Sequence, residues 1–412
     1  MKKLKIAFIV GVFPGLSETF ILNQITELLK KGHDVEIFSV RKNEELTHHE
    51  IINKLNLMRL VSFFPLVPKN KILRIIKGGF LFIKFFLKNP TKMLKAINFF
   101  SLEKDVFSLK ILYHIIPFLR KEFDIIHSHF GNTGEIGVFL RKGGMKGKLV
   151  TTFYGYDLST HVNLFGKDVY KELFEHGDLF LPICNYFKKK IVKLFCDPIK
   201  IQIHTIGINM DSFNLNLKTH KTNEQVQILS VGRLIEKKGF EYSINALKVL
   251  NREKKNFFYT IIGDGPLLKK LKQLVVDLEL DDCVKFEGSV TIEALPSYYN
   301  VADIFLLPSL TAENDDEEGT PTVLLEAQAS GLPVVSTFHS GIPEIVLHKK
   351  TGFLVEEKDI KAIAYYLDIL ISDYKLRREM GNNGRNFVKE KFDIRLLSTV
   401  LIDYYKELIN KE

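Results

Sequence analysis

Short apolar runs alternate along the chain with longer segments in which apolar residues recur every three or four positions. The short runs predict buried strands, and the longer segments predict amphipathic helices. The expected strands are KIAFIV, DVEIFSV, DIIHSH, KLVTTFYG and LFLPIC in the first half, and QILSVGRL, NFFYTIIGDG, VKFEGSV, DIFLLPS and PVVST in the second. Such alternation is typical of α/β folds with parallel sheets, in which helices cross over between strands.

The periodic pattern lapses near residues 206–225, where Asn and Thr cluster and Gly207 offers a flexible corner. A chain of 412 residues is long enough for two ordinary domains. We therefore predict two doubly wound α/β domains facing a cleft, over residues 1–207 and 223–389. The last segment, residues 390–412, has a helical pattern and no strand of its own, and we expect it to pack back on the first domain.

Composition is that of an ordinary globular protein, with 46% hydrophobic and 26% charged residues. Cys184, Cys196 and Cys283 have no spacing typical of disulfides or zinc, which favours the reducing cytoplasm. The start, MKKLKIAFIVGVF, has the basic end and apolar run of a signal peptide but lacks a small-residue cleavage site, so we interpret it as the first strand. No apolar run approaches the roughly eighteen residues of a spanning helix.

Positive charge is concentrated in the first half. Residues 1–200 carry 32 Lys and Arg against 18 Asp and Glu, within a net charge of +9 for the whole chain. The segment 51–102 has ten basic residues and no acidic one, interleaved with phenylalanines. This mixture suits contact with an anionic membrane surface, and a solvated basic face over a core helix is the alternative. No nucleic-acid-binding motif accompanies the charge, so nucleic acid is not an expected partner.

The segment EGTPTVLLEAQASGLPVVST carries clear helix signals. Pro321 suits the first position of a helix and Thr320 its N-cap, while Gly331 suits the left-handed stop. The sequence predicts a helix from about Pro321 to Ser330, directly after the strand DIFLLPS. Its amino end would expose backbone amides, including that of Gly319, and such an end binds anions such as a diphosphate.

Two carboxylates flank this predicted anion site. Glu318 stands in the loop before the helix, and Glu326 stands on its second turn. Separated in this way, they can accept hydrogen bonds from sugar hydroxyls on either side of a diphosphate. Alternatively, Glu326 charges an exposed helix face and Glu318 belongs to the acidic run that begins at Asp315.

A second candidate group follows the strand QILSVGRL. Arg233 and Lys238 come after Gly232 in a short loop before a helix. Ligands of open α/β sheets bind at the carboxyl ends of the strands, so both cations are placed to stabilise a leaving diphosphate. The alternative is a solvated loop in which Lys237 is an equal partner.

In the first domain, FIVGVFPGLSETF predicts a strand, a glycine-containing loop and a helix with Ser17 as N-cap. The loop lacks the G-x-G-x-x-G fingerprint, but its backbone can approach a substrate closely at Gly15. His127 and His129 end the strand DIIHSH. We expect only one of them to face the cleft and choose His129, which is nearer the edge. Two histidines without a third ligand are poor evidence for zinc, and no Asp-x-Asp pair follows a strand, so no metal is expected.

Together these segments resemble family 4 retaining glycosyltransferases of the GT-B fold, in particular the branch that builds bacterial exopolysaccharide, colanic-acid-type and lipopolysaccharide chains. The family's order is kept by PGLSETFILNQI, HSHFG, TTFYGYDLS, GRLIEKKGF, IIGDGPL, FLLPS, EGTPTVLLEAQASGLPVVST and HSGIPEIV, over nearly the whole chain. Glu318 and Glu326 match the family's Glu-x7-Glu hallmark. Relatives often have histidine in place of Tyr154, which puts a contact to sugar or acceptor in doubt there.

The resemblance implies two Rossmann-like domains and a metal-independent hexose transfer with retention of configuration. It implies that Arg233 and Lys238 hold the diphosphate of a nucleotide-sugar, that Glu326 binds its ribose, and that His129 lines the reaction centre. The transferred sugar would be bound by Glu318, Gly319, Thr320 and Pro321. A UDP-sugar is expected rather than a GDP-sugar, with no cofactor. The expected acceptor is a glycan or lipid-linked sugar, met by a cytoplasmic, peripheral enzyme on the inner face of the cytoplasmic membrane.

Two other functions remain open from the sequence. A sugar-nucleotide epimerase of the same architecture would also grip a nucleoside diphosphate, although it would not need a basic, lipid-facing surface. A non-catalytic membrane-associated subunit that binds donor or glycan is the second, and the presence of Arg233, Lys238, Glu318 and Glu326 argues against it. Release of nucleoside diphosphate from the donor would distinguish an enzyme from a binder.

Overall fold

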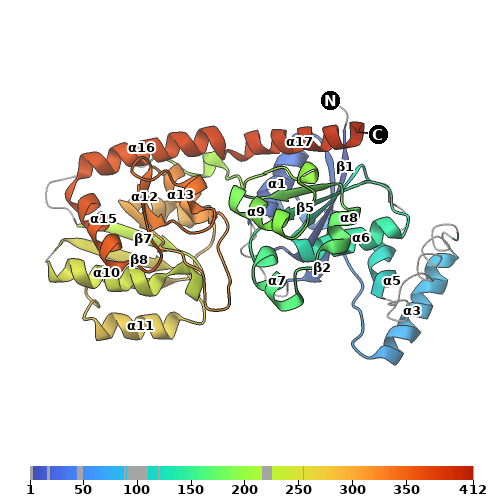
Figure 1. Ribbon diagram of the computed structural model, residues 1–412, viewed down its shortest axis with the longest axis horizontal. Coiled ribbons are helices and arrows are strands. Elements are labelled where there is room, and N and C mark those ends of the chain that lie inside the picture. Colours follow the sequence, from blue (N-terminus) through green and yellow to red (C-terminus); the bar gives the residue numbers. More distant parts are fainter. Residues whose placement is uncertain are drawn as a thin grey trace.

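The computed structural model describes residues 3–15, 19–43, 50–87, 90, 110–118, 121–215, 225–253 and 255–411. Two lobes lie side by side, and each contains a parallel sheet with helices around it (Figure 1). The α/β class predicted from the alternation of short and periodic segments is confirmed. Ser17, the predicted N-cap of the first helix, lies outside the described residues.

The first lobe contains a six-stranded sheet in the order β3-β2-β1-β4-β5-β6. Its strands are β1 (Lys5–Phe13), β2 (Asp34–Lys42), β3 (Val61–Phe63), β4 (Ile125–His129), β5 (Lys148–Phe153) and β6 (Leu179–Pro182). Its helices are α1 (Thr19–Lys30), α2 (Glu50–Lys54), α3 (Lys71–Phe86), α5 (Lys110–Ile115), α6 (Gly131–Lys142), α7 (Thr160–Phe165), α8 (Lys171–His176) and α9 (Asn185–Lys193).

The second lobe repeats this architecture in the order β12-β11-β10-β7-β8-β9. Its strands are β7 (Val226–Val231), β8 (Phe257–Ile262), β9 (Val284–Gly288), β10 (Ile304–Leu306), β11 (Val334–Thr337) and β12 (Gly352–Val355). Its helices are α10 (Phe240–Arg252), α11 (Leu268–Asp277), α12 (Leu295–Val301), α13 (Thr322–Ala329), α14 (Ile342–Ile345), α15 (Ile360–Ser372) and α16 (Tyr374–Lys391).

Strands β3 and β12 are the two that the sequence pattern did not predict. Both are short, and both lie at the edge of a sheet, where a strand has one neighbour instead of two. Short edge strands carry little of the continuous apolar signal that identifies a central strand of a parallel sheet. The ten predicted strands all match strands of the structure within a few residues.

Each sheet reverses its strand order beside its first strand, and these two switch points bring the predicted site residues together. In the first sheet β1 lies between β2 and β4, and in the second β7 lies between β8 and β10. Doubly wound sheets bind ligands at this point, beyond the carboxyl ends of the strands. Gly15 follows β1 and His129 ends β4, whereas Arg233 follows β7 and Glu318 lies in the loop after β10.

The chain passes from the first lobe to the second beside the point at which it returns. Ile208 makes backbone hydrogen bonds with Phe392 and Ile394. A side chain at Gly207 would place its Cβ 2.9 Å from the Cα of Ile394. Close packing of two backbones therefore explains the glycine that the sequence suggested as a flexible corner. The boundary residues 216–224 lie outside the described residues.

Helix α17 (Ile394–Asn410) continues the line of α16 and crosses to the first lobe (Figure 1). There Leu401, Ile402 and Tyr405 are buried in the core cluster that includes β1 and α1. The Tyr405 hydroxyl lies 2.6 Å from His127 Nδ1 on β4. In the part of the chain that the structure describes, no helix combines the length and the apolar character needed to cross a bilayer.

Tyr405→Phe should lower the free energy of unfolding by about 1–3 kcal/mol, because a fully buried His127 nitrogen would lose its partner. Tyr404→Phe is the matched control, since that hydroxyl contacts the Ile203 carbonyl oxygen at 3.4 Å and is only partly buried. Urea unfolding followed by circular dichroism measures both. Equal midpoints for the two variants would contradict the predicted role of Tyr405.

Candidate active site

Helix α13 begins at the carboxyl end of β10, next to the switch point of the second sheet. Its N-cap is Pro321, whose ψ of 118° is extended, and no side chain caps the helix. The prediction of Thr320 as N-cap is therefore wrong: the helix starts one residue later, and the buried Thr320 hydroxyl has no hydrogen-bond partner among the described residues. Gly331 has a φ of +80° and is the predicted left-handed stop.

The Glu318 carboxylate is buried beside two lysines. Its Oε1 lies 3.0 Å from Lys238 Nζ and 3.5 Å from Lys237 Nζ. Burial alone would raise the pKa of the Glu318 carboxyl, but the two lysines outweigh burial and lower it. Because a buried charge is costly unless it is paired, Glu318 and Lys238 hold each other in place.

Lys238 shares the loop after β7 with two other cations, Lys237 and Arg233, whose surroundings differ from its own. Lys237 Nζ also lies 3.0 Å from Asp316, so its charge is shared with a second carboxylate. Arg233 is exposed, and its guanidinium forms no ion pair with any residue that the structure describes. Lys238 has one carboxylate partner in the described chain, and Arg233 remains available to a ligand.

Glu326 lies on the second turn of α13 and is partly buried, not on an exposed helix face. Its Oε2 accepts a hydrogen bond of 2.8 Å from the hydroxyl of Tyr299, a fully buried residue of α12. Burial raises the pKa of the Glu326 carboxyl, and the bond from Tyr299 only partly offsets it. A carboxylate kept half-buried at this cost is a candidate binding group.

His129 ends β4 with its ring fully buried. Its Nδ1 lies 2.6 Å from the Tyr154 hydroxyl, whereas its Nε2 has no partner among the described residues. Burial lowers the pKa of His129 to about 3, so the ring is neutral at physiological pH. The ring of His127 stacks on it at 4.4 Å. The two histidines therefore lie on the same face of the sheet, as alternate residues of a strand do. They differ in position along β4, because His129 ends the strand and His127 lies two residues before its end.

Tyr154 connects His129 to the loop of the other lobe. A side chain at Gly319 would place its Cβ 2.4 Å from the Tyr154 carbonyl oxygen, so only glycine fits there. The buried Asp157 carboxylate holds this turn by accepting hydrogen bonds from the backbone N–H groups of Tyr154 and Gly155. Burial raises the pKa of Asp157 to about 6 despite these bonds. Tyr154, whose role the sequence left open, thus lies where the lobes meet.

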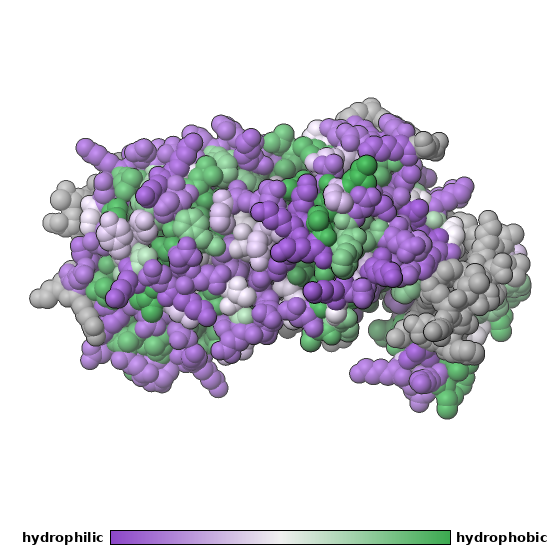
Figure 2. Space-filling view, viewed as in Figure 1, coloured by the Kyte–Doolittle hydropathy of each residue, from purple (hydrophilic) through white to green (hydrophobic). Residues whose placement is uncertain are grey.

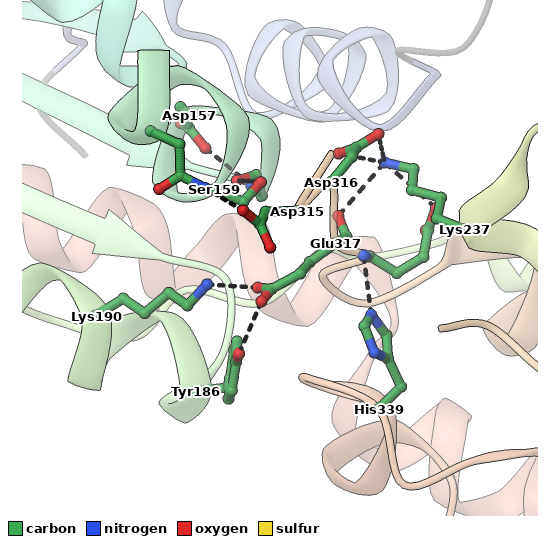
Figure 3. Close-up of polar contacts among 12 residues, drawn as sticks. Asp157, Ser159, Tyr186, Lys190, Lys237, Asp315, Asp316, Glu317 and His339 are labelled. Carbon is green, nitrogen blue, oxygen red and sulfur yellow. Dashed lines mark hydrogen bonds and ion pairs between the residues drawn. The ribbon is translucent and has the colours of Figure 1, made fainter. Parts of the chain in front are cut away.

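Acidic residues of the second lobe also contact helix α9 of the first (Figure 3). Glu317 accepts hydrogen bonds from Lys190 Nζ at 2.5 Å and from the Tyr186 hydroxyl at 3.1 Å. Glu344 accepts bonds from the backbone N–H groups of Asn185 and Tyr186, at the start of α9. These bonds hold the lobes in contact on the side of the predicted site.

Gly15 is partly buried and directly follows β1, at the same sheet edge as His129. Residues 16–18, which come next, lie outside the described residues. Within the described chain, a group of three potential metal ligands occurs on α8, formed by Glu172, Glu175 and His176. The two glutamates are exposed, and none of the predicted site residues belongs to this group.

The sequence pointed to Tyr154 but left its role open. Four other residues that support the site were not predicted, namely Tyr299, Glu317, His339 and Glu357. His339 lies in HSGIPEIV, a motif that marked the family but suggested no contact. Its Nε2 accepts a hydrogen bond from the Glu318 backbone N–H. The end of β11 two residues before His339 was the available signal, because β11 is a neighbour of β10 in the sheet.

Comparisons with known families cover most of the chain. The family described as "Glycosyltransferase Family 4" matches residues 17–212, and "Glycosyl transferases group 1" matches residues 213–387. The amylovoran biosynthesis glycosyltransferase AmsK of Erwinia amylovora is 37% identical over 88% of this chain and 90% of its own length. The putative colanic acid biosynthesis glycosyltransferase WcaL of Escherichia coli (strain K12) is 34% identical over the same shares.

Solved structures share the fold at low identity. A glycosyltransferase from Rickettsia africae has a TM-score of 0.71 and 19% identity, and covers 100% of both chains. Anabaena Alr3699/HepE, solved in complex with UDP and glucose, has a TM-score of 0.71 and 16% identity, over 98% of this chain and 99% of that one. These likenesses identify the two-lobed fold as GT-B.

Glu326→Gln should stabilise the protein at neutral pH, because the amide can still accept from Tyr299 without burying a charge. A raised carboxyl pKa means that the folded state favours the protonated form, so the gain should vanish as the pH falls below the ordinary range of glutamate. A gain of roughly 1 kcal/mol would raise Tm by about 2–4 °C. Thermal scans from acidic to neutral pH measure it, and a Tm difference independent of pH would contradict the shift.

Proposed function

The chain belongs to glycosyltransferase family 4, and from that premise we propose that it transfers a hexose from a nucleotide-sugar to a glycan or lipid-linked sugar, with retention of configuration. One observation carries the proposal: a buried carboxylate, Glu318, is paired with Lys238 between the carboxyl end of β7 and the amino end of α13. Cations and helix amides converge there on a site suited to a diphosphate.

The diphosphate would lie between Arg233, Lys238 and the first amides of α13. Its ribose would be bound by Glu326, which stands a turn or more from the amino end of the helix. The hexose would be bound by Glu318, Gly319, Thr320 and Pro321. The Thr320 hydroxyl, which has no partner in the described part of the chain, offers a further hydrogen bond there. His129 would meet the hexose from the first lobe, because its Nε2 is buried and has no partner among the residues that the structure describes.

Transfer breaks the bond between the anomeric carbon and the diphosphate oxygen, and the electron pair leaves with the diphosphate. The acceptor hydroxyl forms its bond on the same face and passes its proton to the departing phosphate. Preorganised cations lower the barrier because negative charge grows on the leaving group. Arg233 and Lys238 can supply this stabilisation without a metal, so we propose that activity survives chelation by EDTA.

The names of the relatives support a proposal for the biosynthetic pathway in which the acceptor occurs. Their printed names assign AmsK to amylovoran biosynthesis and WcaL to colanic acid biosynthesis. The matches extend over both lobes, including the first, which we propose binds the acceptor. We therefore propose that this enzyme acts in the synthesis of a bacterial surface polysaccharide, at the cytoplasmic face of the membrane.

Incubation with a panel of UDP- and GDP-hexoses tests the reaction, with UDP-sugars as the first donors. A retaining transferase should release nucleoside diphosphate slowly in water, and the released sugar should keep the configuration of the donor when followed by proton NMR. An epimerase would change the sugar without releasing nucleoside diphosphate. A non-catalytic subunit would leave every donor intact, and either result would reject the proposal.

Lys238→Ala should lower kcat by about 10²–10³, the loss expected for one preorganised charge donor. Glu326→Gln is the contrasting variant in the same assay: it should raise the donor KM more than it lowers kcat, as a uniform binding contact does. Steady-state kinetics with the active donor measure both. A wild-type kcat in Lys238→Ala would remove Lys238 from the reaction.

We also propose that α3 docks the first lobe on an anionic bilayer. The helix projects from the lobe, and the space-filling view shows hydrophobic surface in the same place (Figures 1 and 2). Its Ile72, Ile76, Phe80 and Ile83 are between 61% and 70% exposed. These four positions form one stripe at helical spacing. Lys71, Arg74, Lys77 and Lys84 lie on the same helix without any acidic residue, so charge favours an anionic lipid surface over a neutral protein partner.

Changing Lys71, Lys77 and Lys84 to Glu should weaken binding to vesicles of equal parts phosphatidylglycerol and phosphatidylcholine by about a hundredfold or more, since each cation contributes roughly 1 kcal/mol. Donor hydrolysis should remain unchanged. The matched control changes the exposed Lys167, Lys171 and Lys189 of the same lobe. Vesicle binding is measured by sedimentation. If both triple variants lose the same amount of binding, net charge explains the effect and the proposed role of α3 is wrong. Lys88, Lys92 and Lys95 extend the basic stretch but lie outside the described residues.

A further inference from the structure

Residues 311–318, called here the acidic loop, lie in the connection between β10 and α13 and include two neighbouring glutamates that reach in different directions. Glu317 contacts Lys190 of the first lobe at 2.5 Å (Figure 3). Glu318 contacts Lys238 of the second lobe at 3.0 Å. Because the two residues are consecutive, a shift of the backbone at Glu318 would disturb both contacts. The position of this backbone therefore sets the geometry of the predicted donor site.

One carboxylate outside the acidic loop holds both of its ends. Glu357, which follows β12, accepts a hydrogen bond of 3.0 Å from the Thr311 backbone N–H through Oε2. Its Oε1 lies 2.6 Å from His339 Nδ1. His339 Nε2 lies 3.1 Å from the Glu318 backbone nitrogen, which closes the path from Glu357 to the far end of the loop.

The protonation of His339 follows from these contacts. A backbone N–H can only donate, so His339 Nε2 accepts from Glu318 and carries no proton. Nδ1 therefore carries the proton of the neutral ring and donates it to the Glu357 carboxylate. The His339 side chain is 0% exposed, so water cannot replace either partner. The pair is a directional relay that ends on the Glu318 peptide.

We propose that His339 and Glu357 are positioning residues of the donor site, because they fix the Glu318 peptide and thereby the carboxylate that faces Lys238. The ligand of that site rests on the proposed glycosyltransfer, whereas the hydrogen-bond relay does not. The relay explains why the buried His339 lies next to a carboxylate that is itself partly exposed. Neither residue touches the diphosphate or the hexose in this proposal.

His348 provides a matched control in the same lobe. Its Nδ1 also accepts a hydrogen bond from a backbone N–H, that of Leu354, at 3.0 Å. The bond spans a turn before β12 and does not touch the acidic loop. His348→Leu therefore removes a hydrogen bond of the same kind without releasing Glu318. It controls for any general loss of stability caused by replacing a histidine in this lobe.

Hydrogen–deuterium exchange measured by mass spectrometry tests the relay without any substrate. His339→Leu should speed exchange of the Glu318 amide at least about tenfold, because its hydrogen-bond acceptor is gone. His339→Gln should keep most of the protection, because its amide oxygen can stand where Nε2 accepts. Unchanged exchange in His339→Leu, or equally fast exchange in His348→Leu, would overturn the proposal.

Kinetics with the active donor separate positioning from a merely structural role. His339→Leu should lower kcat by about 10²-fold, the scale of a misplacement near 1 Å, while the Kd of UDP stays within about threefold. His339→Gln should recover at least about tenfold of this loss, and His348→Leu should remain near the parent. A Gln variant as slow as the Leu variant would overturn the proposal. A parent that turns over no donor would reject the proposed function, and the exchange experiment alone would then decide the relay.

Discussion

A buried carboxylate is the constraint on which the candidate site depends. Glu318 is almost fully buried where two lobes meet, and a charge in that position is tolerated only if an opposite charge and hydrogen bonds compensate it. Lys238 supplies the charge, and His339 fixes the peptide from which the carboxylate extends. The conformation of the acidic loop therefore depends on Lys238 after β7, His339 after β11 and Glu357 after β12.

The same loop unites the lobes. Glu317 reaches α9 while Glu318 faces the cations of the second lobe, and Gly319 packs directly on the Tyr154 carbonyl oxygen. Hydrogen bonds between separate domains are usually replaceable by water, but several of these atoms are buried or charged and have few alternatives. The position of one lobe and the shape of the donor site are consequently linked through three consecutive residues.

Stability and function oppose each other at several of these positions. Glu326 is held half-buried against its preference for water, and both the His129 ring and the Thr320 hydroxyl retain a buried polar atom without a described partner. Groups of this kind cost free energy in the folded protein and are most often found where a ligand satisfies them. The helix α17 and the Tyr405–His127 contact stabilise the lobe in which His129 lies.

The sequence by itself determined the fold class, ten of the strands and the loops that carry candidate chemistry, because hydrophobic periodicity is local and parallel strands bring their carboxyl ends to one edge. Glu318, Glu326, Lys238 and His129 could be predicted as site residues because each lies at the carboxyl end of a predicted strand or in the loop or helix that follows it. The tertiary structure alone decided that Lys237 shares its charge with Asp316, that His127 contacts Tyr405 of α17, and that Pro321 is the cap. It also placed Tyr154 and His339 against the acidic loop, because loop conformations have no periodicity and such contacts join residues far apart in the chain.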